Sequence, residues 1–89
     1  MSRRWRPVVT PQAERDLNRL PEKAAAAVLE ALVAIEDDPH RLGKPLIAEL
    51  EGVLSARRGP YRILYRLDRF TGVIYVVAIG HRADVYRPR

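Results

Sequence analysis

The sequence predicts a single α+β domain in which a helical hairpin packs on a small, mainly antiparallel sheet, with the elements in the order β-α-α-β-β-β. Three observations lead to this prediction. A short β-compatible segment comes first, apolar residues then recur at helical spacing over residues 11–38, and three β-type runs occupy residues 53–80. The 89 residues suffice for one core, and no repeat or change of composition marks a second unit. Residues 1–89 are therefore expected to form one domain.

The first strand and the first helix are expected to meet at Thr10 and Pro11. Arg4–Val9 is β-compatible, Thr10 is a suitable N-cap, and Pro11 fits the first helical turn, where no amide donor is needed. The apolar positions of this helix are Ala13, Leu17 and Leu20. Pro21 is expected to end it, because a helix interior does not accept proline.

A second helix is expected from Pro21 to near Asp37. Its apolar residues at helical spacing are Ala25, Val28, Leu32 and Ile35, with Leu29 and Val33 beside them. Its many alanines indicate close packing against the other helix or the sheet. The next segment, His40–Glu51, contains Gly43 and Pro45 and is predicted to be a connection that crosses one edge of the domain.

Three further strands are expected at Val53–Arg58, Tyr61–Asp68 and Val73–Gly80. Gly59 and Pro60 suit the two central positions of a type II′ turn, so the first two of these strands should form a tight hairpin. The third contains VIYVVAI, an apolar run with no polar break. It is therefore predicted to lie inside the sheet with both faces covered.

The turn sets the register of the hairpin, in which Arg57 pairs with Arg62 and Arg58 pairs with Tyr61. The side chains of Arg57 and Arg62 then become neighbours on one face. Like charges placed opposite each other cost stability, so this pair indicates a function. The alternative is that these arginines are solvated edge residues that discourage aggregation. The other face is expected to join the core through Leu54, Ala56, Ile63 and Tyr65.

Positive charge is concentrated in the last third of the chain. The formal net charge is +5, but residues 1–56 carry 8 Lys/Arg against 9 Asp/Glu, whereas residues 57–89 carry 8 Arg against 2 Asp. Arginine holds phosphate through two parallel hydrogen bonds, so this distribution predicts a polyanionic partner, with nucleic acid ahead of an acidic protein. Arg58, Arg66 and Arg87 are accordingly assigned to substrate binding.

Several classes of protein are excluded by what the sequence lacks. The absence of cysteine excludes a disulfide framework and a thiolate metal site, and the two histidines and scattered carboxylates show no metal-ligand spacing. No apolar run reaches the roughly 18 residues of a membrane span, and no signal-type apolar core follows the basic first residues. A cytoplasmic protein without a metal, another cofactor or membrane contact is therefore expected.

A second group of candidates lies in GHRADVYR, residues 80–87. Gly80 allows the chain to leave the sheet sharply, and His81 exchanges a proton near neutral pH. Arg82 can hold a phosphate, and Tyr86 can stack on a base. No Asp or Glu is clearly placed to orient His81, so a surface role is the alternative to catalysis for this residue.

In the order and spacing of its segments, the chain resembles the RelE/ParE superfamily of bacterial toxins from toxin-antitoxin modules. The resemblance covers nearly the whole chain, through ERDLNRLP and DDPHRLGKPL in the first half and ARRGPYRILYRLD and VVAIGHRADVYR in the second. The GHR…VY ending is similar to the RelE branch, whose members enter the ribosomal A site and cut mRNA. The ParE branch has a similar fold, poisons DNA gyrase and generally lacks that ending. The resemblance therefore implies a RelE-like fold and a toxin that inhibits translation as an mRNA endoribonuclease.

Carried over by position, the resemblance assigns catalytic roles to Arg57, Arg62, Arg82 and Tyr86. In the family, such residues promote attack of the RNA 2′-hydroxyl on the adjacent phosphate without a metal ion, which leaves a 2′,3′-cyclic phosphate and a 5′-hydroxyl. Ser55 stands where some RelE members have a lysine, and serine cannot act as the base. His81 is then the catalytic candidate for proton transfer, because arginine is rarely deprotonated.

The resemblance also implies three partners: a cognate antitoxin, which would be acidic or amphipathic and RelB-like, the ribosome and mRNA. Two alternatives remain open, namely a ParE-like gyrase inhibitor with no active site and a plain basic module that binds nucleic acid. DNA damage signalling in place of translation arrest would indicate the first alternative. Smooth salt-dependent binding without cleavage or toxicity would indicate the second.

Overall fold

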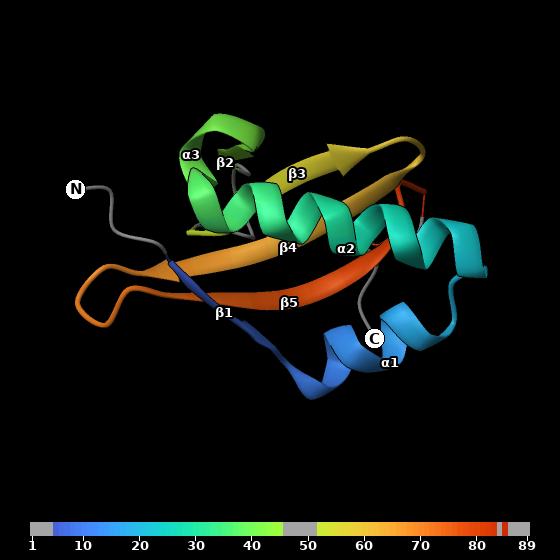
Figure 1. Cartoon of the computed structure of the whole chain (residues 1–89), viewed down its shortest axis with the longest axis horizontal. Helices are drawn as coiled ribbons and strands as arrows, with labels where there is room; N and C mark the ends of the chain where they lie inside the picture. The colour runs from blue at the N-terminus through green and yellow to red at the C-terminus, as the bar shows by residue number, and fades with distance from the viewer. Residues whose placement is uncertain (1–4, 46–51, 84, 86–89) are drawn as a thin grey trace.

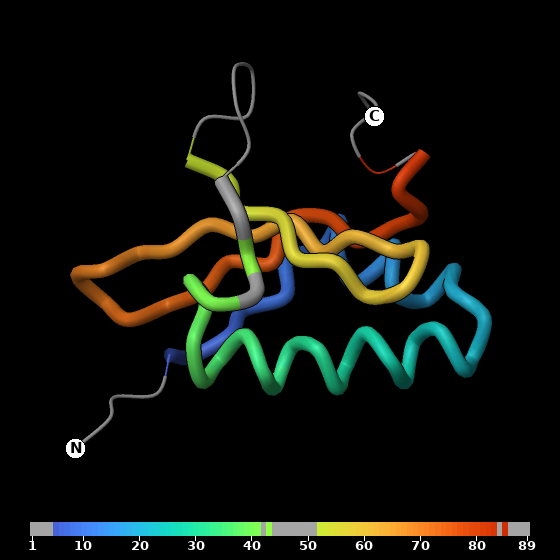
Figure 2. The backbone as a smooth tube through the Cα atoms, turned by 90° about the horizontal axis from the view of Figure 1, so that it is seen from above, coloured from blue at the N-terminus to red at the C-terminus, as the bar shows by residue number. Residues whose placement is uncertain are grey.

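The computed structural model describes residues 5–45, 52–83 and 85, which form a layer of helices and a five-stranded sheet (Figure 1). The helices are α1 (Pro11–Asn18), α2 (Glu22–Asp37) and α3 (Pro39–Leu42). The strands are β1 (Arg6–Val9), β2 (Gly43–Pro45), β3 (Leu54–Arg58), β4 (Tyr61–Asp68) and β5 (Val73–His81). In the view along the sheet, α2 runs beneath one face only (Figure 2). We call the other face, which carries Arg57, Arg62 and Leu64, the open face.

The strands follow the order β1-β5-β4-β3-β2 across the sheet. β1 runs parallel to β5, and the three remaining neighbouring pairs are antiparallel. This arrangement confirms the predicted α+β class with a mainly antiparallel sheet. Within the described ranges, no helix is both long and apolar enough to cross a membrane.

The segment predicted to be a simple connection, residues 40–51, contains regular structure in its described part. Pro39 begins the single turn of α3, and Gly43–Pro45 forms β2, whose Gly43 pairs with Ala56 of β3. A strand of three residues is too short to show the alternation of polar and apolar residues that marks longer strands. The local sequence therefore gave no sign that this segment pairs with β3. The prediction of a simple connection was wrong for residues 40–45, which include most of α3 and all of β2. Residues 46–51 lie outside the described part.

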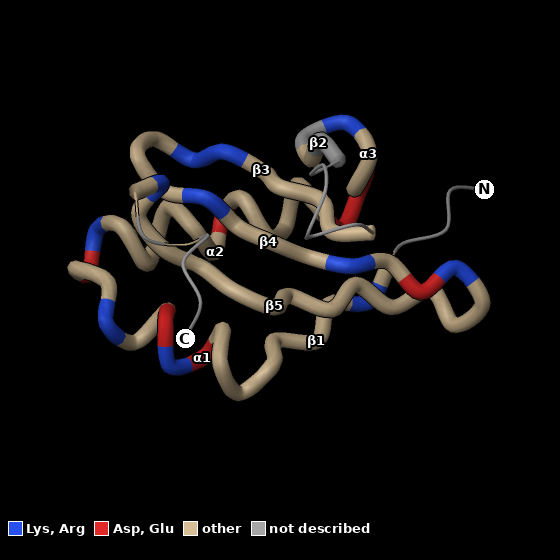
Figure 3. Tube along the Cα trace, turned by 180° about the vertical axis from the view of Figure 1, so that it is seen from behind, with Lys and Arg blue, Asp and Glu red and all other residues tan. Residues whose placement is uncertain are grey.

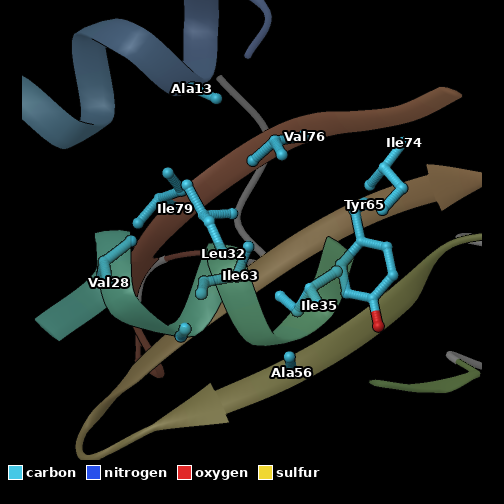
Figure 4. Close-up of a cluster of buried hydrophobic side chains, with 11 residues drawn as sticks. Ala13, Val28, Leu32, Ile35, Ala56, Ile63, Tyr65, Ile74, Val76 and Ile79 are labelled. Carbon is cyan, nitrogen blue, oxygen red and sulfur yellow. The ribbon is translucent and has the colours of Figure 1, made fainter. Parts of the chain in front are cut away.

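The core lies between α2 and the sheet (Figure 4). One side of α2 is buried through Val28, Ala31, Leu32 and Ile35. The core positions predicted for the hairpin are confirmed, since Ala56, Ile63 and Tyr65 are buried and Leu54 packs against them. Leu29 and Val33 lie on the outer side of α2 and are 50% and 52% exposed. The helix therefore has a narrower buried stripe than its apolar residues alone indicate.

β5 lies inside the sheet, between β1 and β4, as predicted. On the helix side its buried residues are Ile74, Val76 and Ile79. On the open face, Val77 and Ala78 pack against a smaller cluster made of Val53, Leu64 and Val85. Tyr75 is 38% exposed. The expectation that both faces are covered is therefore right for the middle of β5 and wrong at Tyr75, because the smaller cluster is too short to extend over the whole strand.

α1 covers the edge of β5 that β1 leaves unpaired. β1 ends opposite Val76, so the amides that follow along β5 face α1. The Thr10 hydroxyl donates to the Val76 carbonyl (2.8 Å) and, as the predicted N-cap, accepts from the Ala13 amide (3.3 Å). The carboxylate of Asp16 is buried and accepts from the Ile79 amide (3.0 Å). Because unpaired edge amides invite pairing with other chains, Asp16 protects this edge.

Tyr65 links β4 to α3. Its side chain is fully buried, and its hydroxyl donates to the Pro39 carbonyl. Gly43 lies directly against the ring, where a Cβ atom would overlap the hydroxyl oxygen and lie 2.6 Å from Cζ. The contact therefore requires glycine at the start of β2, although the backbone there is ordinary extended chain.

The buried hydroxyl of Tyr65 gives the fold a dependence on alkaline pH. Burial raises the pKa of Tyr65 to about 12, and the charge of Asp38 acts in the same direction, whereas a backbone hydrogen bond from Gly43 opposes them. Tyrosines in the unfolded chain ionise near pH 10. Between about pH 10 and pH 12 the folded state therefore keeps the Tyr65 hydroxyl proton that the unfolded state has lost. The stabilisation is complete below about pH 10 and is lost as the pH rises toward about 12.

Urea titrations over this pH range should show a steeper fall in the free energy of unfolding for the parent chain than for Tyr65→Phe. The phenylalanine variant is the matched control, because it keeps the ring and the other titrating groups. Parallel pH profiles for the two proteins would contradict the assignment.

Candidate functional site

Arg57 and Arg62 lie opposite each other on the open face. They are paired residues of β3 and β4, and their neighbours Ala56 and Ile63 belong to the core on the other face. Gly59 turns the chain between the strands with a φ of 58°, in the left-handed region that L side chains rarely adopt. The predicted register is therefore confirmed, and two positive side chains extend from adjacent positions of the sheet.

These two arginines have no neutralising carboxylate in the part of the chain that the structure describes. Arg62 Nη1 donates to the carbonyl of Tyr61 (3.3 Å), which holds the side chain against β4 without offsetting its charge. Two like charges opposite each other reduce the stability of the sheet. The pair therefore forms a positively charged site that an anion would neutralise.

Arg82 lies at the same end of the sheet. Gly80 of β5 pairs with Arg62, and two residues later the Arg82 amide donates to the carbonyl of Pro60 in the hairpin turn (2.9 Å). The Arg82 side chain is exposed and has no ion-pair partner among the described residues. Figure 3, which looks onto the open face, shows the basic positions of β3 beside the first basic position of β4. We call Arg57, Arg62 and Arg82 the arginine cluster.

Arg58 is directed to the other side of the sheet. It shares the face of Ala56, and its Nη2 lies 3.5 Å from Glu30 Oε1 of α2. The two side chains are 44% and 75% exposed, so this ion pair adds little stability. Arg58 therefore lies on the face opposite Arg57, because a strand sends successive side chains to opposite faces. Its assignment to substrate binding stays a prediction.

Arg66 shares the open face with Arg62 but lies four residues further along β4, roughly 13 Å away. Its Nη1 is near Gly52, at 3.4 Å from the position that a Cβ atom would take there. Arg66 thus lies toward the opposite end of the open face from the arginine cluster. Its assignment to substrate binding stays a prediction.

Beyond β5 the chain returns to the open face at Val85. This residue packs against Leu64, and its amide donates to the His81 carbonyl (2.9 Å). Tyr86 and Arg87 follow Val85 in the sequence and lie outside the described residues. Their roles in catalysis and substrate binding stay predictions.

His81 lies on the helix side of the sheet, away from the arginine cluster. It pairs with Tyr61, and the two rings meet edge to face with centroids 6.1 Å apart and an interplanar angle of 82°. Its Nδ1 accepts from the Ala83 amide (3.1 Å), so the neutral ring carries its proton on Nε2. His81 therefore lies on the face opposite Arg57 and Arg62, because β5 extends through His81 and continues the alternation of its side chains. Its catalytic role stays a prediction.

His81 and Tyr61 line a hollow between the last turn of α1, the start of β4 and the end of β5. The hollow has a volume of about 490 Å³, and the residues around it include Asp16, Arg19, Leu20, Tyr61, Ile79 and His81. Neither Arg19 nor Tyr61 was predicted to belong to a functional site. No local pattern links a residue at the end of the first helix to one at the end of the last strand.

Charge stabilisation is the chemistry that the arginine cluster offers. Guanidinium groups hold the oxygens of a phosphate and stabilise the further negative charge of a transition state at phosphorus. They do not exchange protons near neutral pH, so another group must do so. Among the described residues, no group of three or more His, Asp or Glu side chains is arranged to hold a metal ion.

Comparison with known proteins places these features in a family. Residues 8–86 match the family described as ParE toxin of the type II toxin-antitoxin system parDE. Toxin RelG of Mycobacterium tuberculosis (strain ATCC 25618 / H37Rv) is 48% identical over 79 residues, which cover 88% of this chain and 91% of RelG. Toxin RelE of the same strain is 48% identical over 80 residues, which cover 89% of this chain and 82% of RelE.

The fold gives a similar result. The crystal structure of the toxin-antitoxin complex RelBE2 from Mycobacterium tuberculosis contains a chain that matches with a TM-score of 0.83 and 42% sequence identity. The match covers 89% of this chain and 99% of that one. Sequence and fold therefore agree over nearly the whole length of both proteins.

Proposed function

The chain belongs to the RelE/ParE superfamily of toxins from type II toxin-antitoxin systems, and on this basis we propose that it is a ribosome-dependent endoribonuclease that cuts mRNA in the ribosomal A site. The observation that carries the proposal is the cross-strand pair of Arg57 and Arg62 on the open face, which no described carboxylate neutralises. Sequence identity to toxins RelG and RelE supports this function over others in the superfamily.

In the proposed reaction, the RNA 2′-oxygen attacks the adjacent phosphorus and the bond from phosphorus to the 5′-oxygen breaks. The 2′-hydroxyl gives up its proton to a base, and the leaving 5′-oxygen takes one up, so the products are a 2′,3′-cyclic phosphate and a 5′-hydroxyl. Negative charge grows on the non-bridging oxygens during attack. The arginine cluster stabilises this charge through charge-assisted hydrogen bonds, and no step requires a metal ion.

In this proposal, Tyr86 and the ribosome position the RNA substrate. A tyrosine that stacks on a base of the A-site codon would hold the 2′-oxygen in line with the scissile bond. Arg57 on β3 and Arg82 in the turn after β5 are both exposed, so neither would hold free RNA in an enclosed site. This supports little cleavage of free RNA and efficient cleavage where the ribosome orders the message.

The proposed partner that silences the toxin is an acidic or amphipathic antitoxin of the RelB type. The solved chain with 42% identity was crystallised as a toxin-antitoxin complex. Carboxylates of such a partner would neutralise the arginine cluster, and a segment that is disordered when free would become ordered on binding.

Gyrase inhibition is the second candidate function. One observation favours it: the family that matches residues 8–86 is the one described as ParE toxin. An inhibitor of this kind acts by binding and needs no cleavage chemistry, so the arginine cluster would then serve only as a contact surface.

Expression of the chain alone in a bacterial host is expected to stop protein synthesis before DNA synthesis. The reason is that cleavage of A-site codons halts elongation directly. Pulse labelling with radioactive methionine and thymidine after induction measures both processes in one culture.

Co-expression of an acidic protein encoded beside the toxin should restore methionine incorporation. Normal methionine incorporation with blocked thymidine incorporation would instead establish the gyrase-directed function. Binding of RNA without arrest of either process would leave only a basic binding module.

A further inference from the structure

We propose that the hollow beside α1 binds a nucleotide of the same RNA strand, next to the position that is cleaved, an inference that rests on the proposed function. The hollow lies where the last turn of α1 meets the start of β4 and the end of β5. Its volume of about 490 Å³ leaves room for a group larger than a single phosphate. It lies on the helix side of the sheet, so it is distinct from the arginine cluster.

The hollow presents hydrogen-bond donors that have no partner within the described ranges. Arg19 forms no ion pair there, the Tyr61 hydroxyl forms no hydrogen bond, and the Nε2–H of His81 is unused. Asp16 also lines the hollow, but its two oxygens already accept from Gln12 Nε2 (2.9 Å) and from the Ile79 amide (3.0 Å). A ligand must therefore supply acceptors, and phosphate is the acceptor that a guanidinium group matches best.

Aromatic and apolar walls accompany these donors. The Tyr61 and His81 rings stand nearly perpendicular to each other, so a planar base can lie flat on either ring. Leu20, Pro21 and Ile79 supply apolar lining. A free phosphate would use the donors alone, whereas a nucleotide uses the donors and the rings together.

The hollow adjoins the arginine cluster around the end of β5. In the register of β4 and β5, the pair Tyr61–His81 directly follows the pair Arg62–Gly80, with its side chains on the opposite face. Arg82 lies at this same end, where its amide is bonded to the hairpin turn. β1 ends opposite Val76 and does not reach this end of β5. A single RNA strand can therefore pass from the arginine cluster to the hollow. For this reason we favour RNA, and not an unrelated acidic peptide, as the ligand of the hollow.

The test measures binding of a fluorescent hexanucleotide of 2′-O-methyl RNA, which cannot be cleaved, to the purified chain by anisotropy at low salt. Arg19→Gln is expected to weaken binding by about tenfold, the effect of one lost charged hydrogen bond. Arg15→Gln is the matched control, because Arg15 lies in the last turn of α1, four residues before Arg19, is exposed, and bonds only to Gln12 Oε1 in the described structure (3.2 Å). It removes the same charge and should weaken binding less than about threefold. His81→Ala should also weaken binding, by about fivefold, through lost stacking.

Equal effects of Arg19→Gln and Arg15→Gln would overturn the proposal, because charge alone would then explain the binding. Unchanged RNA affinity of Arg19→Gln and His81→Ala, together with weaker binding of the antitoxin, would overturn it in favour of a protein site. Arg62→Ala separates this inference from the proposed function. If Arg62→Ala weakens binding and the hollow variants do not, only the hollow is wrongly assigned; if the hollow variants weaken binding and Arg62→Ala does not, the arginine cluster is not the RNA site.

Discussion

Arg62→Ala is expected to lower cleavage of mRNA on programmed ribosomes by about 100-fold and to abolish growth arrest, with the fold intact. Arg62 is a partly exposed residue opposite Arg57, and in the described structure its side chain bonds only to the Tyr61 carbonyl. Its removal therefore takes away transition-state stabilisation and relieves repulsion in the sheet. The cleavage rate is measured by primer extension on ribosomes that carry a defined A-site codon.

Arg62→Lys should recover only part of the lost rate, because an ammonium group cannot make the paired contact to phosphate. Arg69→Ala is the matched control, since Arg69 is an exposed arginine in the turn at the other end of β4. Its rate should stay within about twofold of the parent rate, as one distant surface charge is largely screened. An Arg62→Ala toxin that cleaves as fast as the Arg69→Ala toxin would refute the role of the arginine cluster.

Gly43→Ala is expected to lower the free energy of unfolding by about 1–3 kcal/mol. The added Cβ would overlap the Tyr65 hydroxyl and lie 2.6 Å from Cζ and 3.1 Å from the Pro39 carbonyl oxygen. Tyr65 has no room to move, because its side chain is fully buried between the sheet and α2. Urea denaturation measures the loss, and far-UV circular dichroism checks that the variant still folds.

The double variant Gly43→Ala/Tyr65→Phe identifies the cause. Removing the hydroxyl leaves the contacts with Cζ and with the Pro39 carbonyl oxygen. The alanine should therefore cost less in the Tyr65→Phe background than in the parent chain, a coupling that a double-mutant cycle detects. Gly59→Ala is a useful comparison, because nothing lies within 4 Å of a Cβ atom there and its cost comes from the positive φ alone. Strictly additive effects at positions 43 and 65 would show that the overlap is not the cause.

The local sequence determined the hairpin and with it the pair at the centre of the proposed site. A two-residue turn at Gly59 and Pro60 allows one register, and the period-two alternation of a strand then assigns each side chain to a face. Both rules act over a few residues, so Arg57 and Arg62 were placed correctly from the sequence. The same alternation places Arg58 on the opposite face from Arg57, where it meets Glu30.

The position of His81 depended on where β5 ends. The predicted strand stopped at Gly80, which left His81 free to join Arg82, whereas the observed strand runs through His81 and pairs it with Tyr61. Strand ends are set by the pairing of amides and carbonyls with a neighbouring strand, here β4, and glycine at position 80 does not by itself interrupt that pairing.

The sequence by itself therefore determined the order of the main elements, the buried face of the hairpin and the pairing of Arg57 with Arg62. Only the tertiary structure decided which polar residues from distant segments meet. In the sequence, Asp16 has the character of a surface residue, but in the fold it is buried and accepts a hydrogen bond from the Ile79 amide of β5. Arg19 lines a hollow only because α1 lies beside the end of that strand. Such contacts join residues more than 60 positions apart. Local propensity and periodicity carry no information about them, because they depend on how the layers pack once the chain has folded.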